Sequence, residues 1–393
     1  MPLRTRLLPL AAALCAVGGA HAQSTPYYVG VSQSFTHESN IYRTRNNEVS
    51  DTISTTSLFG GVDQMVGRQR VYGNATVSAN KFLDNGSLDN TGYGLKAGVD
   101  WATIERISGT VELNANQSLA RYENAAGNSD KNTLRDLSFR AVARVGVVTR
   151  LTAETIYTYR RVDYSLNAYR ARNYDQNAVS AGLRYRFSGA LTAGAALRFT
   201  KGEYPDRTPR DEYDRRDIDF TANWTPTGNS SVNGRISLSD TSHSVASNAD
   251  YSGVTGELNW DWRPTGKLQF VTSLTRDTGE EISLLGGSAD QVLTNSRIST
   301  SIGTRATYAV TSKVVADASV RYVHRKLDAS LLNLSADGGD NTRFVTLGLR
   351  WMAMRSLTLG CSVGYESRTS SSTLSAPYDT RTASCYGQFA LQL

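Results

Sequence analysis

Alternation between apolar and polar side chains is the feature that most constrains the fold of this chain. In residues 256–277, GELNWDWRPTGKLQFVTSLTRD, Trp260 and Trp262 lie on one parity, and Asn259 and Asp261 lie on the other. Because successive strand residues point to opposite faces, this stretch predicts a β-hairpin with one apolar face and one polar face. Such two-sided strands fit a β-sandwich, a soluble barrel or a membrane barrel.

The connections between the alternating segments favour a membrane barrel. These segments run from Tyr27 to Leu393, and short turns alternate with long polar connections between them. Outer-membrane barrels have short periplasmic turns, long extracellular loops and an even number of strands. A β-sandwich gives no reason for this rhythm, and soluble domains rarely exceed about 250 residues without splitting. We therefore expect an all-β, transmembrane antiparallel β-barrel of about 18 strands, or about 16 if the weakest hairpin is misread.

The same rhythm predicts which connections share a side of the membrane. Short turns are expected at positions such as 225–230 and 352–356, and an even strand count puts both chain ends in the periplasm. The long connections, which include residues 203–216 and 331–341, are rich in Asn, Asp, Gly or Arg. We expect them to be extracellular loops, with residues 203–216 either exposed or folded into the mouth of the barrel.

The first residues have the three-part pattern of a secretory signal peptide. Arg4 and Arg6 precede an apolar run, and small residues follow it up to Ala22. A membrane anchor is the alternative, but the run is shorter than the roughly 20 apolar residues of a spanning helix. We expect residues 1–22 to be a signal peptide and residues 23–393 to form a single β-barrel domain in the bacterial outer membrane.

Charge and composition exclude several function classes. The chain has a formal net charge of +6, and loss of the two signal-peptide arginines leaves +4, so charge indicates no nucleic-acid partner. Outside the signal peptide the histidines are His37, His243 and His324, and their spacing fits neither a metal site nor a catalytic triad. We therefore expect no enzymatic activity, no cofactor and no metal.

The polar parity of the strands supplies the candidate functional residues. In a barrel whose apolar parity faces lipid, the opposite parity lines the interior, and its mixed charges imply water inside. Amides and charges there could exchange hydrogen bonds with sugar hydroxyls, although for any one residue simple wetting of the lumen is the alternative. The lumen-lining candidates are Glu112, Asn114, Asn116, Arg140, Arg144, Arg160, Arg184, Arg186, Arg198, Asp217, Asp219, Asn223, Glu257, Asn259, Asp261 and Arg321.

Cys361 and Cys385 are the cysteines that remain after the signal peptide. Paired residues of an antiparallel hairpin have a constant index sum, and a turn centred near Thr373 places these two directly opposite each other. Each shares its parity with apolar residues, so both are expected to face lipid. The alternatives are a cross-strand disulfide, which needs a directly opposed pair, and two unpaired apolar side chains.

Two stretches add a family resemblance. Residues 50–82, SDTISTTSLFGGVDQMVGRQRVYGNATVSANKF, and residues 92–123, GYGLKAGVDWATIERISGTVELNANQSLARYE, resemble the EpsL-like outer-membrane β-barrel proteins encoded in exopolysaccharide biosynthesis operons. The resemblance implies a porin-like conduit that exports a polysaccharide, with outer-membrane lipid, the secreted polysaccharide and periplasmic export machinery as partners. It carries no functional residues to particular positions and leaves the oligomeric state open.

Two other functions fit the same pattern. Barrels of about 16 to 18 strands leave an aqueous channel, which suits a general or oligosaccharide-uptake porin as well as an export conduit. A structural or adhesive barrel would instead have its lumen blocked by an inward-folded loop.

Overall fold

The computed structural model describes residues 26–104, 106–122, 129–146, 149–245, 249–278, 298–331, 334–372 and 375–393. The expected signal peptide lies outside these residues. Among the residues described, no helix is long and apolar enough to cross a membrane.

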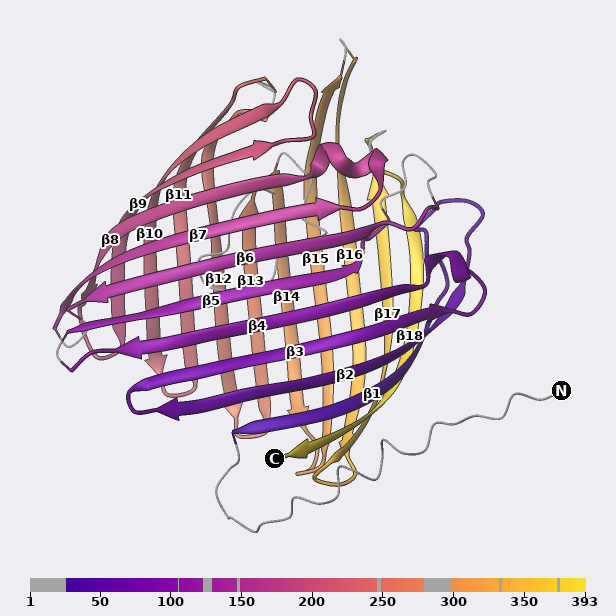
Figure 1. Ribbon diagram of the computed structural model, residues 1–393, viewed down its shortest axis with the longest axis horizontal. Coiled ribbons are helices and arrows are strands. Elements are labelled where there is room, and N and C mark those ends of the chain that lie inside the picture. The colour runs from indigo at the N-terminus through magenta and orange to yellow at the C-terminus, as the bar shows by residue number, and fades with distance from the viewer. Residues whose placement is uncertain are drawn as a thin grey trace.

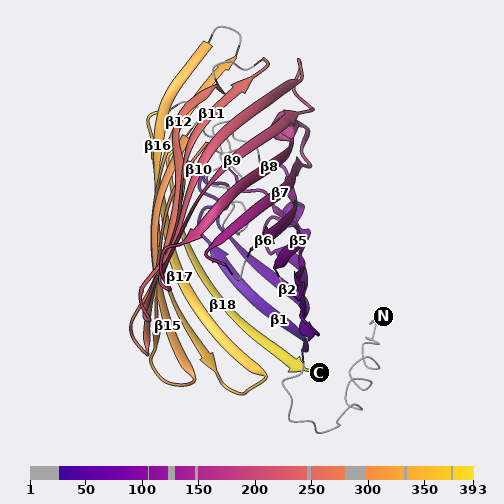
Figure 2. The same cartoon turned by 90° about the vertical axis from the view of Figure 1, so that its left-hand side faces the viewer.

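Eighteen antiparallel strands form one closed sheet, in which each strand pairs with its neighbours in sequence and β1 also pairs with β18 (Figures 1 and 2). In the closing ladder, Tyr28 pairs with Gln392 and Glu38 with Thr382. The expected fold class is thereby confirmed, including the strand count. The strands are β1 (Tyr27–Glu38), β2 (Asp51–Val66), β3 (Gln69–Phe82), β4 (Asn90–Ala102), β5 (Ile107–Leu119), β6 (Thr133–Val145), β7 (Leu151–Tyr164), β8 (Tyr174–Arg186), β9 (Leu191–Tyr204), β10 (Asp211–Thr227), β11 (Ser230–His243), β12 (Tyr251–Thr265), β13 (Leu268–Asp277), β14 (Ile298–Ala309), β15 (Val314–Leu331), β16 (Leu334–Met352), β17 (Leu357–Ser370) and β18 (Tyr378–Gln392). The 3₁₀ helices η1 (Gly86–Leu88) and η2 (Asn167–Arg172) follow β3 and β7.

The apolar parity lies on the outside of the barrel, where a membrane protein meets lipid. Val31, Leu58, Phe199 and Leu347 are all more than half exposed. Exposed apolar side chains on nearly every strand would be costly in water and are favourable in lipid. Toward the short-turn end, Trp262 stacks on Trp260 and on Phe270, as expected of an aromatic girdle.

The short turns lie at the end of the barrel where β1 begins and β18 ends. The longer connections lie at the other end (Figure 1). Short turns mark the periplasmic side of outer-membrane barrels, so the opposite end is extracellular. Two expected loops are shorter than the sequence suggested. Only residues 205–210 connect β9 to β10, and β15 and β16 extend to Leu331 and from Leu334. Charged and turn-forming residues made these segments look like loops, but pairing with the adjacent strand continues the ladders past the apolar band.

The extracellular connections have a small core of their own. Ile41, Phe82, Leu88 and Tyr122 are buried together, and burial raises the pKa of the Tyr122 phenol. Such packing orders the loops between β1 and β6, because it removes apolar surface from water.

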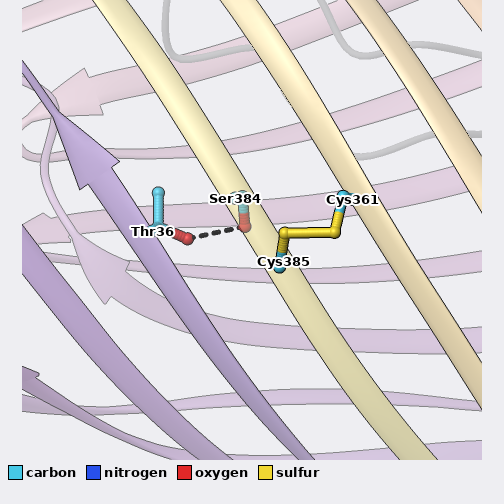
Figure 3. The surroundings of a disulfide bond; sticks show 4 residues. All are labelled: Thr36, Cys361, Ser384 and Cys385. Atoms are coloured by element: carbon cyan, nitrogen blue, oxygen red, sulfur yellow. Dashed lines mark hydrogen bonds between the residues drawn. A yellow bond between two sulfur atoms is a disulfide. The ribbon is translucent and has the colours of Figure 1, made fainter.

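Cys361 and Cys385 stand directly opposite each other on β17 and β18 and form a disulfide. Their Cα atoms are 4.1 Å apart. On the other side of β18, the hydroxyls of Thr36 and Ser384 are 2.8 Å apart across the closing ladder (Figure 3). The last hairpin is thus linked covalently within itself and by side chains to the first strand.

Candidate functional site

All of the predicted lumen residues lie on the inward parity, opposite the exposed apolar residues of their strands. They differ in their environment, however. Arg160, Arg198, Asp217 and Asp219 are buried, whereas Arg186 is exposed. Asn116 is exposed as well. The remaining candidates are partly buried: Glu112, Asn114, Arg140, Arg144, Arg184, Asn223, Glu257, Asn259, Asp261 and Arg321. The interior is therefore not one evenly wetted channel wall, and whether these residues contact a solute stays a prediction.

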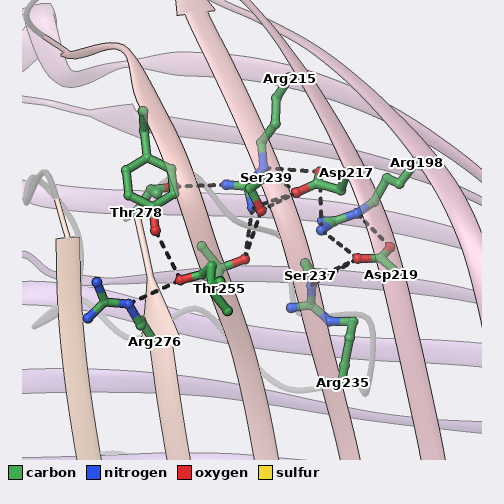
Figure 4. A network of polar contacts seen from close by, with 12 residues as sticks. Arg198, Arg215, Asp217, Asp219, Arg235, Ser237, Ser239, Thr255, Arg276 and Thr278 are labelled. Carbon is green, nitrogen blue, oxygen red and sulfur yellow. Dashed lines mark hydrogen bonds and ion pairs between the residues drawn. The ribbon is translucent and has the colours of Figure 1, made fainter.

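A buried ladder of charges crosses the interior of β9, β10 and β11 (Figure 4). The Nε of Arg198 donates to Asp219 Oδ2 at 3.1 Å, and its Nη2 lies 3.2 Å from Asp217 Oδ2. Arg215 donates to Asp217 through Nε at 2.9 Å, and Arg235 Nη1 lies 3.4 Å from Asp219. These five side chains are at most 3% exposed.

Hydroxyl groups complete this ladder. Ser239 Oγ donates to Asp217, and Arg215 Nη2 donates to Ser239 and to Thr255 on β12. Arg215 also donates through Nη1 to Thr278, the first residue after β13, at 2.9 Å. The chain therefore turns from the wall toward the interior as soon as β13 ends. Since acids and hydroxyls surround the arginines, the ladder can stay charged without water.

A second buried network lies inside β15, β16 and β17. Arg325 donates to both oxygens of Asp340, through Nε at 2.9 Å and Nη2 at 2.5 Å. Ser375 donates to the same carboxylate, and Arg368 Nε lies 3.9 Å from it. Arg325, Asp340 and Arg368 are at most 2% exposed.

Arg121, which follows β5, joins the upper wall of the barrel to its last strands. It forms an ion pair with Glu366 on β17 and donates to the Tyr378 hydroxyl at 2.8 Å. Its guanidinium also lies over the Phe344 ring. These contacts narrow the extracellular mouth on the β5 side.

A cluster of tyrosines and one histidine fills the interior at the extracellular ends of β7 to β11. Tyr204, Tyr213 and His243 are in ring contact, and His243 Nδ1 lies 3.1 Å from Asp211 Oδ2. The spacing of the histidines in the sequence did not predict this acidic partner of His243. The pairing was not visible because Asp211 is 32 residues away, and only the β10–β11 register brings the two together.

At the periplasmic end the interior has a different character. Arg144, Arg150, Arg184 and Arg186, with threonines between them, line a pocket of about 150 Å³ inside β6 to β9. Glu154 forms ion pairs with two of these arginines, at 2.6 Å from Arg144 and 3.5 Å from Arg184. Arg150 and Arg186 are exposed and form no ion pair with any residue in the described ranges. Arg150 was missed because it lies in the short turn before β7.

We name these four side chains the periplasmic arginine pocket. Its two free guanidinium groups offer planar, always-charged donors that match a carboxylate or phosphate. Within the described part of the chain no group of acids, histidines and cysteines could hold a metal ion. Arginine side chains of this kind could bind an anion reversibly.

No family model matches the chain, and no curated protein matches it. The resemblance to the EpsL-like proteins thus has no support beyond the quoted residues. Solved structures do match. Pseudomonas aeruginosa OccK2 (OpdF) has a TM-score of 0.52 at 15% identity, over 94% of this chain and 100% of that one. OccK1 (OpdK) from the same organism, and OpdK with vanillate, each give 0.50 at 14% identity over 93% of this chain and 99% of theirs.

At such identities the likeness is one of fold. It agrees with the closed 18-stranded sheet and its exposed apolar band. The chain is a porin-like β-barrel of the bacterial outer membrane.

Proposed function

We propose that this barrel is an uptake channel for small organic anions, with carboxylates as the substrate class. The observation that carries the proposal is the periplasmic arginine pocket, in which Arg150 and Arg186 face the interior without an acidic partner among the described residues. Uncompensated charge inside a low-dielectric wall concentrates ions of opposite sign and speeds their entry. OpdK, a barrel of similar fold, was solved with vanillate, which is a carboxylate.

The charge distribution along the interior supports transport of anions toward the periplasm. Arg198, Arg215 and Arg235 are balanced by Asp217 and Asp219 within the buried ladder and by Glu257, which lies 3.7 Å from Arg235. They therefore contribute little net field to a passing ion. Arg150 and Arg186 are not balanced in this way, so the positive field rises toward the periplasmic end. An anion that passes the narrow upper part is drawn toward the exit.

Export of a polysaccharide, the other expectation, has less support. A hydrated glycan chain needs a wide lumen whose wall is wet. In the extracellular half of β9 to β11 the interior side chains are instead buried, and many of them are bonded to one another. Burial of these side chains also supports the third expectation, a structural or adhesive barrel whose lumen is blocked. A blocked barrel, however, gives no reason for Arg150 and Arg186 to lack acidic partners among the described residues at the periplasmic end.

Planar-bilayer recordings of the purified barrel test the proposal. Under a KCl gradient the wild-type channel should be anion-selective, and R150Q/R186Q should shift the reversal potential toward cation selectivity. Proteoliposomes should take up benzoate-sized carboxylates faster than neutral sugars of the same size, and the double variant should lose most of that preference. The matched control is R355Q, which removes an exposed arginine from the β16–β17 turn, outside the pocket.

An unchanged reversal potential in R150Q/R186Q would contradict the proposal. So would a wild-type channel that passes neutral sugars and carboxylates at equal rates.

A further inference from the structure

At the extracellular rim the strands β13 and β14 are shorter than the strands that flank them, and we call this step in strand length the notch. The β12–β13 ladder stops at Gly256 and Arg276, but β12 continues for five residues to Tyr251 beside β11. On the other side the β14–β15 ladder stops at Ile298 and Lys326, and β15 continues for five residues beside β16. Five strand residues span about 17 Å, so the flanking strands rise well above the two short ones.

Arg276 occupies the floor of this notch. Arg276 is labelled in Figure 4. Where the β12–β13 ladder stops, the carbonyl of Val254 accepts hydrogen bonds from Arg276 Nε at 3.0 Å and from the Tyr251 hydroxyl at 2.9 Å. Arg276 Nη1 donates to Thr300 on β14 at 3.2 Å. The guanidinium is thus held in place by neutral acceptors at the surface.

Beside the notch lies a recess of about 640 Å³, lined by Arg276 and by residues of β15 and β16 that include His324, Lys326 and Asn341. Asn341 Oδ1 lies 2.9 Å from His324 Nδ1. None of the described residues that line the recess is acidic, and neither Arg276 nor Lys326 forms an ion pair with a described residue. The described lining of the recess therefore carries positive charge.

The recess is on the outer face of the barrel. Arg276 shares its parity with Leu274, and Lys326 shares its parity with Tyr322 and Val320, which are exposed to lipid. Tyr322 and Tyr365 mark the upper edge of the apolar band, where tyrosines settle at lipid headgroups. Arg276 and Lys326 are further toward the outside, at the depth of the headgroups of the outer leaflet.

Two outward basic residues on another part of the rim have acidic partners. Arg161 pairs with Asp163 at 3.0 Å, and Lys201 pairs with Glu212 at 3.5 Å. On the recess side, the exposed outward Arg343, which pairs in register with Tyr322, adds a third cation. Three outward basic residues without an acidic partner among the described residues thus lie at or beside the recess.

We propose that this recess binds the phosphorylated headgroup of lipopolysaccharide, the glycolipid of the outer leaflet. A phosphate there is met by the guanidinium of Arg276 and the ammonium of Lys326, which are strong donors to phosphate oxygens. His324, Asn341 and the backbone of the two glycines on β16 that line the recess offer hydrogen bonds to the adjoining sugar. The acyl chains then lie along the apolar band below. This site is independent of the channel interior.

The test uses the full barrel extracted in detergent, with R276Q/K326Q as the variant. Binding is measured by native mass spectrometry with added lipid A that carries both phosphates, and with the same lipid after dephosphorylation. At about 1 kcal/mol for each basic residue near an anionic headgroup, the double variant should bind phosphorylated lipid A about thirtyfold more weakly. The wild-type protein should bind dephosphorylated lipid A as weakly as the variant does.

The matched control is R161Q/K201Q, which removes two outward basic residues that already have acidic partners and should leave lipid A binding unchanged. Unaltered mobility of the folded barrel on gels, with and without boiling, shows that each variant folds. Equal binding of lipid A by wild type and R276Q/K326Q would overturn the proposal. Displacement of lipid A by an equal concentration of inorganic phosphate would also overturn it, because the site would then prefer the free ion.

Discussion

Arg198 donates two hydrogen bonds to Asp219, from Nε at 3.1 Å and from Nη2 at 3.2 Å, and both side chains are at most 2% exposed. The same carboxylate accepts a hydrogen bond from Ser237 and lies 3.4 Å from Arg235. One acid thus holds two arginines inside the barrel wall.

Asp219→Ala should therefore be strongly destabilising. Removal of one partner of a buried ion pair leaves the other charge buried without compensation, which typically costs about 3 to 5 kcal/mol. Urea unfolding in lipid vesicles, followed by tryptophan fluorescence, measures the change. Asp63→Asn is the control, because its ion pair with Arg70 is exposed and its loss should not move the midpoint measurably. Equal midpoints for Asp219→Ala and wild type would show that the ladder contributes nothing.

The disulfide should be present in protein isolated from the oxidising periplasmic side of the cell. Mass spectrometry of unreduced, alkylated protein should find Cys361 and Cys385 in one cross-linked peptide pair. The closed loop has a sequence separation of 24, for which the chain-entropy estimate gives about 3 kcal/mol. C361S/C385S should thus unfold at lower urea yet keep the same barrel. Recovery of both cysteines alkylated without prior reduction would refute the bond.

Gly98 on β4 is opposite Tyr72 on β3, and the phenol ring packs directly over the glycine. A Cβ at position 98 would overlap that ring. Gly98→Ala should cost about 1 to 3 kcal/mol, as overpacking typically does. In the double variant with Tyr72→Ala, the added cost of the alanine at 98 should largely vanish.

The control for this steric prediction is Gly228→Ala in the β10–β11 turn, where a Cβ would meet no atom within 4 Å. Urea midpoints of the wild type, Gly98→Ala, Tyr72→Ala and the double variant form the cycle. Additive effects of the changes at 72 and 98 would exclude a direct contact between ring and glycine as the cause.

Orientation in the membrane can be tested with inserted epitopes. A tag near Pro209, in the connection between β9 and β10, should bind antibody on intact cells. A tag at Gly228, in a short turn at the other end, should bind only after permeabilisation. The opposite labelling pattern would show that the barrel is inverted and that the periplasmic arginine pocket lies on the extracellular side.

The sequence alone determined the properties that depend on local periodicity. Because a strand has a period of two, alternation assigned each interior candidate and each lipid-facing apolar residue to its face. The rhythm of short and long connections indicated the strand count. The constant index sum of a hairpin placed Cys361 opposite Cys385, as the register shows. All of these are relations between neighbouring strands.

Only the tertiary structure decided what lies side by side inside the barrel and how far the strands rise above the membrane. The contact between Arg121 and Tyr378 joins residues 257 positions apart, and it exists because β1 pairs with β18 and closes the sheet. Polar composition predicted loops at 203–216 and 331–341, where interstrand hydrogen bonds instead continue the ladders. Closure, curvature and strand length are set by pairing over the whole sheet, so the buried ladder, the arginine pocket and the rim recess have no local signal in the chain.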